Sequence, residues 1–171
     1  MARRSWLYES VQAGLTDNGP WSKDAIDTML TRVADLPRLT GEELTAAEDL
    51  GIARLREGDT RAAIALGAAG CHRAVAALLA VATSPVATAS NRLRAAEGLL
   101  LLGNATGPAV ALEIARGDGW IGDRREAVRV LGGHGADSTI AALVELTTDA
   151  DAGLRYEAGV ALVRARTRTA G

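Results

Sequence analysis

The segments RAAIALGAAG (residues 61–70), RAAEGLLLLG (94–103) and EAVRVLGGHG (126–135) share one pattern of alanine, leucine and glycine. In each, an alanine is followed by a leucine four residues later and by a glycine eight residues later. A fourth, shorter copy begins at Ala158 and Leu162. The alanines that start the copies are 33, 32 and 31 residues apart: Ala62, Ala95, Ala127 and Ala158. Such regular spacing indicates a repeated structural unit, in which this alanine is counted as position 0.

Each copy predicts two helices. Positions 0, 3, 4 and 7 are apolar and lie on one face of an α-helix, as in Ala62, Ala65, Leu66 and Ala69 of the first copy. The glycine at position 8 suits the left-handed backbone conformation that ends many helices. A second apolar stripe begins at position 13, and in the first copy it comprises Val75, Leu78, Leu79 and Ala82. Each copy is therefore predicted to be a helical hairpin.

The composition agrees with a helical fold. Hydrophobic residues make up 48% of the 171 residues and charged residues 23%, which is the balance of a folded globular domain. The chain has no Phe, three Trp and two Tyr, so alanine, leucine and valine must fill most of the core. Alanine favours helices, and the aromatic enrichment of strands is missing. We expect an all-α fold.

Four segments resemble HEAT-like repeats of the bilin lyase (PBS lyase) type, in which an arginine commonly precedes the first helix and a Leu-Gly pair lies within it. These segments are Arg61–Gly67, Arg94–Leu100, Arg124–Gly132 and Asp151–Arg155. The resemblance implies a right-handed α-α superhelix, which is a solenoid of helical hairpins. It is informative about the fold and says almost nothing about the function.

The chain divides into two parts on this basis. Residues 1–58 match the pattern less well and are expected to form a divergent N-terminal helical cap, with helices at about 23–36 and 42–57. The first 20 residues are either another short helix or a binding arm, and we expect Trp6, Tyr8 and Trp21 to pack in the core of the cap. Residues 59–171 hold the HEAT-like repeats, at about 59–91, 92–123 and 124–154 with a truncated copy at 155–171.

The second helices of a HEAT-like solenoid line its concave side, where extended partners usually dock. The charged candidates for partner contact on these helices are Arg73, Glu113, Arg116 and Glu145. Trp120, in the loop between the second and third copies, is a further candidate. Its indole either anchors a partner or folds back over the gap between the repeats, and the sequence leaves both readings open.

A series of arginines stands three residues before the starting alanines and is expected to be structural. The resemblance implies that Arg92, Arg124 and Arg155 pair with acidic residues between neighbouring repeats, and Asp123 and Asp151 are plausible partners. Exposed ion pairs contribute little stability, so such a ladder would mainly fix the rotation between repeats.

No motif points to catalysis, a metal or a cofactor. The string Gly117-Asp-Gly-Trp-Ile-Gly122 matches a dinucleotide-binding pattern, but it follows a helix and not a strand, so we interpret it as a loop. Asp149-Ala-Asp-Ala-Gly153 lacks the ligand spacing of a calcium loop and is expected to cap the next helix. Cys71, His72 and His134 are too few for a metal site and are expected to be turn or packing residues.

The main functional hypothesis is a non-enzymatic adaptor or scaffold that binds another protein or peptide. The alternatives are an enzyme or enzyme accessory, such as a lyase-like or chaperone-like factor that holds a small molecule or peptide, and a nucleic-acid binder. The formal charge of −2 argues against nucleic acid. One cysteine, no apolar run of roughly 20 residues and no signal peptide favour a cytoplasmic protein without a membrane partner. Self-association stays open.

Overall fold

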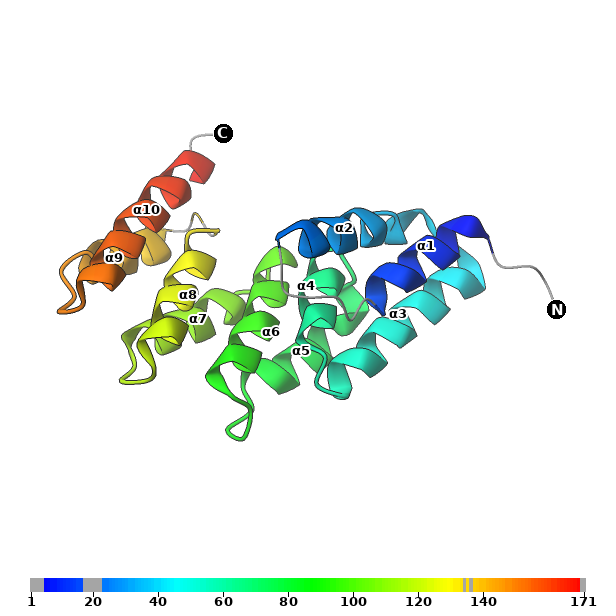
Figure 1. The fold of residues 1–171 in the computed structure, drawn as a ribbon, viewed down its shortest axis with the longest axis horizontal. Coiled ribbons are helices and arrows are strands. Elements are labelled where there is room, and N and C mark those ends of the chain that lie inside the picture. The colour runs from blue at the N-terminus through cyan, green and yellow to red at the C-terminus, as the bar shows by residue number, and fades with distance from the viewer. Residues whose placement is uncertain (1–4, 17–22, 134, 136, 170–171) are drawn as a thin grey trace.

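The computed structural model describes residues 5–16, 23–133, 135 and 137–169. Within these residues the chain forms ten α-helices and two short 3₁₀ helices and has no β-strand, which confirms the all-α class (Figure 1). The helices are α1 (Trp6–Leu15), α2 (Lys23–Val33), η1 (Leu36–Arg38), α3 (Gly41–Arg56), α4 (Thr60–Ala68), η2 (His72–Ala74), α5 (Val75–Ala82), α6 (Ala89–Leu101), α7 (Thr106–Arg116), α8 (Ile121–Leu131), α9 (Asp137–Leu146) and α10 (Ala152–Thr169).

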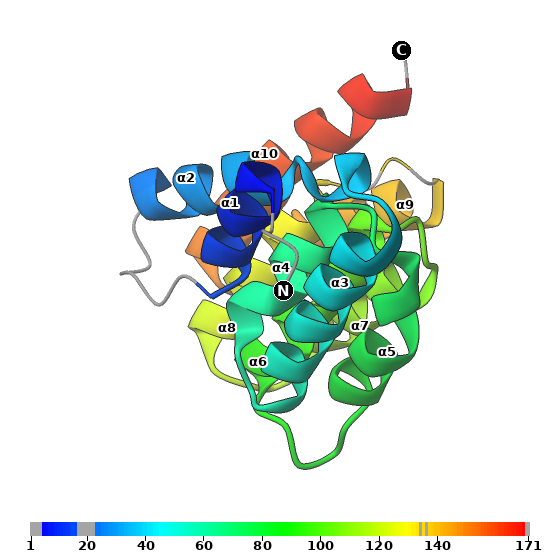
Figure 2. The same ribbon diagram turned by 90° about the vertical axis from the view of Figure 1, so that its right-hand side faces the viewer.

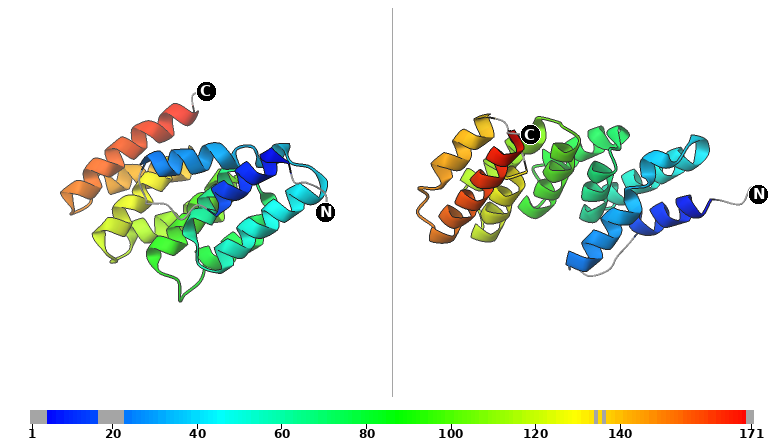
Figure 3. Two further views of the ribbon diagram at one scale, coloured as in Figure 1. Left: turned by 45° about the vertical axis from the view of Figure 1, so that its right-hand side comes forward. Right: turned by 90° about the horizontal axis from the view of Figure 1, so that it is seen from above.

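The helices lie in two rows along the long axis of the molecule. In the first row α6 packs on α4, α8 on α6 and α10 on α8, and in the second row α5 contacts α3, α7 contacts α5 and α9 contacts α7. The view from above in Figure 3 shows the helices following one another along this axis, and Figure 2 views the same arrangement from the N-terminal end. The repeated sequence pattern thus corresponds to a repeated order of helices.

The glycines at position 8 end helices as predicted in the first two copies, whereas in the third copy α8 already ends at Leu131, before Gly135. Gly70 and Gly103 have φ values of +69° and +71°, a region that side chains with a Cβ rarely occupy. The Gly70 amide donates to the Gly67 carbonyl, and the following Cys71 amide donates to the Leu66 carbonyl. Helix α6 of the second copy ends with the equivalent pair of bonds. This arrangement is the Schellman motif.

The core between the rows consists of small side chains and leucines. Leu66, Leu99 and Leu131 at position 4 are all 0% exposed, and the alanines at position 0 are equally inaccessible. The backbones of α4 and α6 come close together at Gly67 and Gly98, where a Cβ on Gly67 would lie 2.7 Å from the Cα of Gly98. Alanine and glycine at these positions therefore set a short distance between the helices of the first row.

The N-terminal helices α1, α2 and α3 have a core of their own, which extends onto α4. This core includes Tyr8, Val11, Leu15, Met29, Val33, Leu36, Leu39 and Ala47, together with Ala65 and Ala69 of α4. Residues 6–15 thus form a helix, and that helix docks against α4. Its first turn is fixed by Ser5, whose amide and hydroxyl each donate to the Glu43 carboxylate of α3 at 2.7 Å.

Two expectations for this region need correction. The expectation of core packing holds for Tyr8, which is 3% exposed, but it is wrong for Trp6, which is 70% exposed, because residue 6 opens the helix on its solvent side. Trp21 lies outside the described residues. The helix expected to reach residue 36 ends at Val33, and Pro37 lies inside η1, whose tighter turn accommodates a residue without an amide hydrogen.

The first copy departs from a simple hairpin. In the second copy α6 and α7 pack on each other, but α8 and α9 of the third copy make few contacts. In the first copy α4 and α5 both pack on α6 and make little contact with one another. The loop from Thr83 to Thr88 joins α5 to α6. This separation leaves a space between α5 and the two preceding helices, α3 and α4.

Candidate functional site

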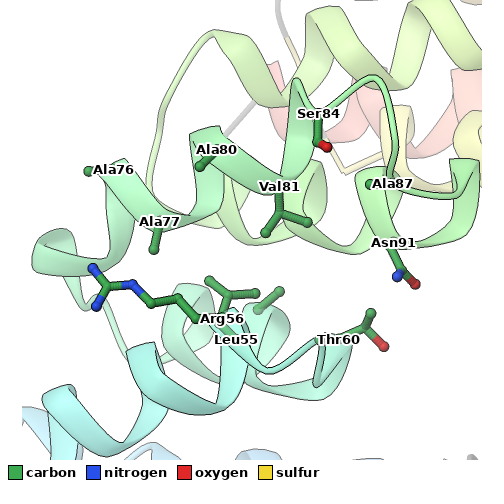
Figure 4. Close-up of a pocket in the computed structure, with 12 residues that line it drawn as sticks. Leu55, Arg56, Thr60, Ala76, Ala77, Ala80, Val81, Ser84, Ala87 and Asn91 are labelled. Atoms are coloured by element: carbon green, nitrogen blue, oxygen red, sulfur yellow. The ribbon is translucent and has the colours of Figure 1, made fainter.

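A pocket of about 440 Å³ lies between the end of α3, the start of α4 and the length of α5. Its size is within the usual range for ligand sites, 300–1,000 Å³. Figure 4 shows α5 on one side and α3 and α4 on the other. The lining residues are Leu55, Arg56, Gly58, Thr60, Ala63, Ala76, Ala77, Ala80, Val81, Ser84, Ala87 and Asn91.

The pocket wall formed by α5 consists of short side chains. Ala76, Ala77 and Ala80 present only methyl groups to the opening, and Val81 is the largest residue of this wall. Thr60, Ser84 and Asn91 place hydroxyl and amide groups toward the end near the α5–α6 loop. The result is an apolar floor with neutral hydrogen-bonding groups at one end.

Arg56 is the charged residue among the described residues that line the pocket. Its side chain extends along the opening, with the guanidinium on the side of Ala77 (Figure 4). Arg56 is exposed and forms no ion pair within the part of the chain that the structure describes. The site therefore combines an apolar surface with one unneutralised positive charge.

The four charged residues predicted to contact a partner lie outside this pocket and are engaged in ion pairs. Arg73 binds the carboxylates of Glu48 and Asp49 of α3, at 2.7 and 2.9 Å. These two hydrogen bonds raise the pKa of the Arg73 guanidinium above its ordinary value.

Glu113, Arg116 and Glu145 likewise form bonds between helices. Glu113 of α7 accepts from Arg92 of α6 at 2.9 Å. Arg116, the last residue of α7, binds Glu145 of α9 at 2.6 Å. These side chains are exposed, and each has a neighbour of opposite charge.

Trp120 immediately precedes α8 and is 73% exposed. A Cβ on Gly122 would overlap the Trp120 ring, so the indole lies over the first turn of its own helix. The indole therefore does not project freely, and one of its faces remains open to solvent. The Gly117–Gly122 string supplies the short link from α7 to α8 and the first residues of α8.

The structural arginine series joins each first-row helix to the end of the segment that precedes it. The Arg92 Nε donates to the Ala82 carbonyl at the end of α5, and the Arg124 Nε donates in the same way to Ala115 at the end of α7. Arg124 also binds Asp149 at 2.6 Å, and Arg155 donates to the carbonyls of Asp149 and Ala150. These arginines close the link between one second-row helix and the next first-row helix.

The acidic partners differ from those expected. Asp123 forms no ion pair with another residue in the described ranges, and Asp151 binds Arg125 instead, at 2.7 Å. The Asp151 carboxylate also accepts the Leu154 amide at 2.7 Å, so it caps α10. The bond from Arg125, followed by that from the amide, lowers the pKa of Asp151.

A separate series of ion pairs connects the first-row helices α6, α8 and α10. Arg94 of α6 binds Glu97 and Glu126, Glu126 also binds Arg129, and Arg129 binds Glu157 of α10. The pair with Arg129 lowers the pKa of Glu157, whereas burial raises the pKa of Glu97 despite the nearby Arg94. The arginines of this series are thus neutralised within the fold.

Cys71 and His72 do not form part of a metal site in the described residues, where no three His, Cys, Asp or Glu side chains are grouped to hold an ion. His134 lies outside the described residues. Cys71 is buried, and burial together with the Glu48 carboxylate raises the pKa of its thiol to about 11. Such a thiol is protonated and unreactive near neutral pH.

The sequence reasoning missed the pocket, although a signal was present. Position 18 holds glutamate in the second and third copies, Glu113 and Glu145, but alanine in the first copy, Ala80. A small, uncharged residue at a position that holds glutamate in the other copies indicates a place where the surface can be recessed. The separation of α4 from α5, which makes the hollow deep, has no such signal in the sequence.

The chain was also compared with known proteins. No protein-family model matches it, and no curated protein matches it at a significant level. No helix in the described part of the chain combines the length and the apolarity needed to cross a membrane. The pocket and the charges around it are therefore the basis for a functional proposal.

Proposed function

We propose that this chain is a HEAT-like α-α solenoid that acts as a non-enzymatic adaptor, and that it binds a segment of a partner protein in the pocket between α3, α4 and α5. The single observation that carries the proposal is the lining of this pocket: short apolar side chains, neutral polar groups at one end and one charge, Arg56. Such a lining can hold an apolar side chain by burial, but it offers no pair of acid and base groups for proton transfer.

The rest of the surface supports binding at this place. Arginines elsewhere on the repeats, such as Arg73, Arg116 and Arg129, are neutralised by carboxylates. A nucleic-acid interface needs several free cations to replace the counterions of the phosphates, so this pattern weighs against that alternative. The second row of helices is the side on which a HEAT-like solenoid would present its concave surface, and α3 and α5 belong to it.

A display library of random short peptides, selected on the purified protein, tests this function. The chain offers a matched pair of variants, because Ala76 and Ala141 both stand at position 14 of a copy and both are exposed. We expect Ala76→Trp, which places an indole at the pocket, to weaken binding of the selected peptides at least about tenfold. Ala141→Trp, on α9, should bind them like the wild type. Equal loss in both variants, or in neither, would contradict the proposal.

A second candidate follows from the volume of the pocket, which also suits a small molecule. In that case the chain is an enzyme accessory that holds a substrate for another protein. A screen of small apolar acids by thermal unfolding distinguishes the two functions. A saturable rise of the melting temperature that Ala76→Trp removes and Ala141→Trp keeps would favour the small-molecule function over the adaptor.

A further inference from the structure

The pocket lies at a junction that lacks a carboxylate present at the junction between α7 and α9, although the other glutamate at position 18, Glu113, binds Arg92 instead. Between α7 and α9, Arg116 at the end of one second-row helix binds Glu145 of the next second-row helix. Glu145 stands at position 18 of its copy, and so does Ala80 of α5. Arg56 is, like Arg116, the last residue of its second-row helix, α3. The junction between α3 and α5 therefore keeps the arginine and lacks the glutamate.

The missing group leaves both a charge and a space. Arg56 and Ala80 both line the pocket, and the guanidinium extends along its opening (Figure 4). A glutamate at position 80 would add a carboxylate to the lining that Ala80 shares with Arg56. With alanine there, the guanidinium meets no carboxylate in the part of the chain that the structure describes. A carboxylate from outside the chain can take that place.

We propose that the partner segment is acidic, and that an aspartate or glutamate side chain of the partner pairs with Arg56 in the way that Glu145 pairs with Arg116. This inference rests on the proposed function, because it specifies the peptide that the same pocket binds. A neighbouring apolar side chain of the peptide lies on the floor formed by Ala77 and Val81. The two contacts together define a short motif of one acidic and one apolar residue.

The ion pair and the apolar contact contribute differently to binding. A guanidinium binds a carboxylate through two parallel hydrogen bonds, which fixes orientation, but an exposed pair contributes modestly to affinity. Most of the affinity then comes from the apolar contact, and the ion pair selects which peptides bind. We expect removal of the charge to weaken binding about two- to threefold, and to reduce its dependence on salt.

The peptides selected on the wild-type protein provide the probe. Their acidic residues are replaced one at a time by the corresponding amides, and binding is measured by fluorescence polarisation to the wild type and to four variants. Arg56→Gln removes the charge, and Arg32→Gln is its control, because Arg32 is an exposed arginine of α2 outside the pocket. Ala80→Glu restores the missing carboxylate inside the protein, and Ala80→Gln adds the same bulk without charge.

The expected result is a consensus acidic residue whose amide form binds about two- to threefold more weakly to the wild type. Arg56→Gln should bind the acidic and the amide peptides equally, and Arg32→Gln should still distinguish them. Ala80→Glu should lose binding far more than Ala80→Gln, because Glu at this position competes for Arg56. A rise in thermal stability of Ala80→Glu over Ala80→Gln would support the same geometry.

The outcomes separate this inference from the proposed function. Peptides without an acidic consensus that still lose binding to Ala76→Trp would overturn the acidic motif and leave the adaptor function standing. Peptides that depend on their terminal carboxylate, and not on a side chain, would also overturn it. If the wild type selects no peptide that Ala76→Trp rejects, both proposals fail together.

Discussion

Gly98 shows how one residue sets the distance between two helices. The side of Gly98 that would carry a Cβ faces the carbonyl oxygen of Ala63 on α4, and a methyl group there would overlap it. We predict that Gly98→Ala lowers the free energy of unfolding by about 3 kcal/mol, because backbone and not a flexible side chain must move. Urea denaturation followed by circular dichroism measures this.

Gly159 provides the control for that substitution. It lies inside α10 with open space where a Cβ would be. Gly159→Ala should leave the stability unchanged or raise it by up to about 1 kcal/mol, since alanine is the better helix former. Destabilisation of both variants to the same extent would contradict the role of the contact with α4, because Gly159 has no such contact.

Cys71 gives a prediction at alkaline pH. Its thiol pKa is raised to about 11 in the folded protein, from 9.0 as its ordinary value. The unfolded chain therefore ionises first, and the stability that the buried thiol contributes is present below about pH 9 and is lost as the pH rises toward 11. We expect Cys71→Ala to reduce the fall in unfolding free energy over this range by about 2 kcal/mol. An unchanged pH profile in the variant would contradict the raised pKa.

At the scale of helices, the arginines that reach backbone carbonyls should matter more than those in exposed pairs. Arg124 joins α8 to the Ala115 carbonyl of α7 and to Asp149, and both partners of the pair with Asp149 are largely buried. Arg124→Met should cost about 1–2 kcal/mol, because it leaves the Ala115 carbonyl without this donor and the Asp149 carboxylate without its cation. Arg116→Met, in an exposed pair, should cost less than about 0.5 kcal/mol. Thermal unfolding of the two variants compares them, and equal losses would contradict this ranking.

The start of α10 gives a prediction at acid pH. The pKa of Asp149 is lowered mainly by the hydrogen bond that it accepts from the Asp151 amide, and further by Arg124. The pKa of Asp151 is lowered mainly by Arg125. Groups with lowered pKa values contribute stability above their ordinary value, near pH 4, and lose it as the pH falls below that. We expect the melting temperature of Asp151→Asn to fall less steeply below about pH 4 than that of the wild type. A parallel fall in both proteins would show that other carboxylates control acid unfolding.

The sequence predicted what depends on neighbouring residues of the chain. Helix ends at Gly70 and Gly103 and the buried leucines at position 4 follow from local conformation and periodicity. The partner of Arg124 could not be predicted in this way, because Asp149 is 25 residues away. Its position depends on the rotation of each helix pair relative to the next. The separation of α4 and α5 was unpredictable for the same reason.

Across the whole molecule, α6 is the helix with the most extensive packing contacts among the described residues. It packs on α4, α5, α7 and α8, whereas α10 packs only on α8 and α9 among the described helices. In molecules built from stacked units, local opening starts at the ends, where each unit has one neighbour. We predict that native-state hydrogen exchange is slowest in α6 and fastest in the last turns of α10. Slowest exchange in α1 or α2 would instead identify the N-terminal helices as the stable unit.

The close approach of α4 and α6 also bears on recognition. Both α4 and α5, which carry opposite walls of the pocket, are fixed to α6, and the contact at Gly67 and Gly98 has no side chain that could rearrange. We therefore expect the two walls to keep their separation when a ligand binds. Affinity is reduced when binding must order a flexible receptor. Here only the incoming segment loses conformational entropy on binding. Binding should then be fast and should leave the protein's own dynamics nearly unchanged.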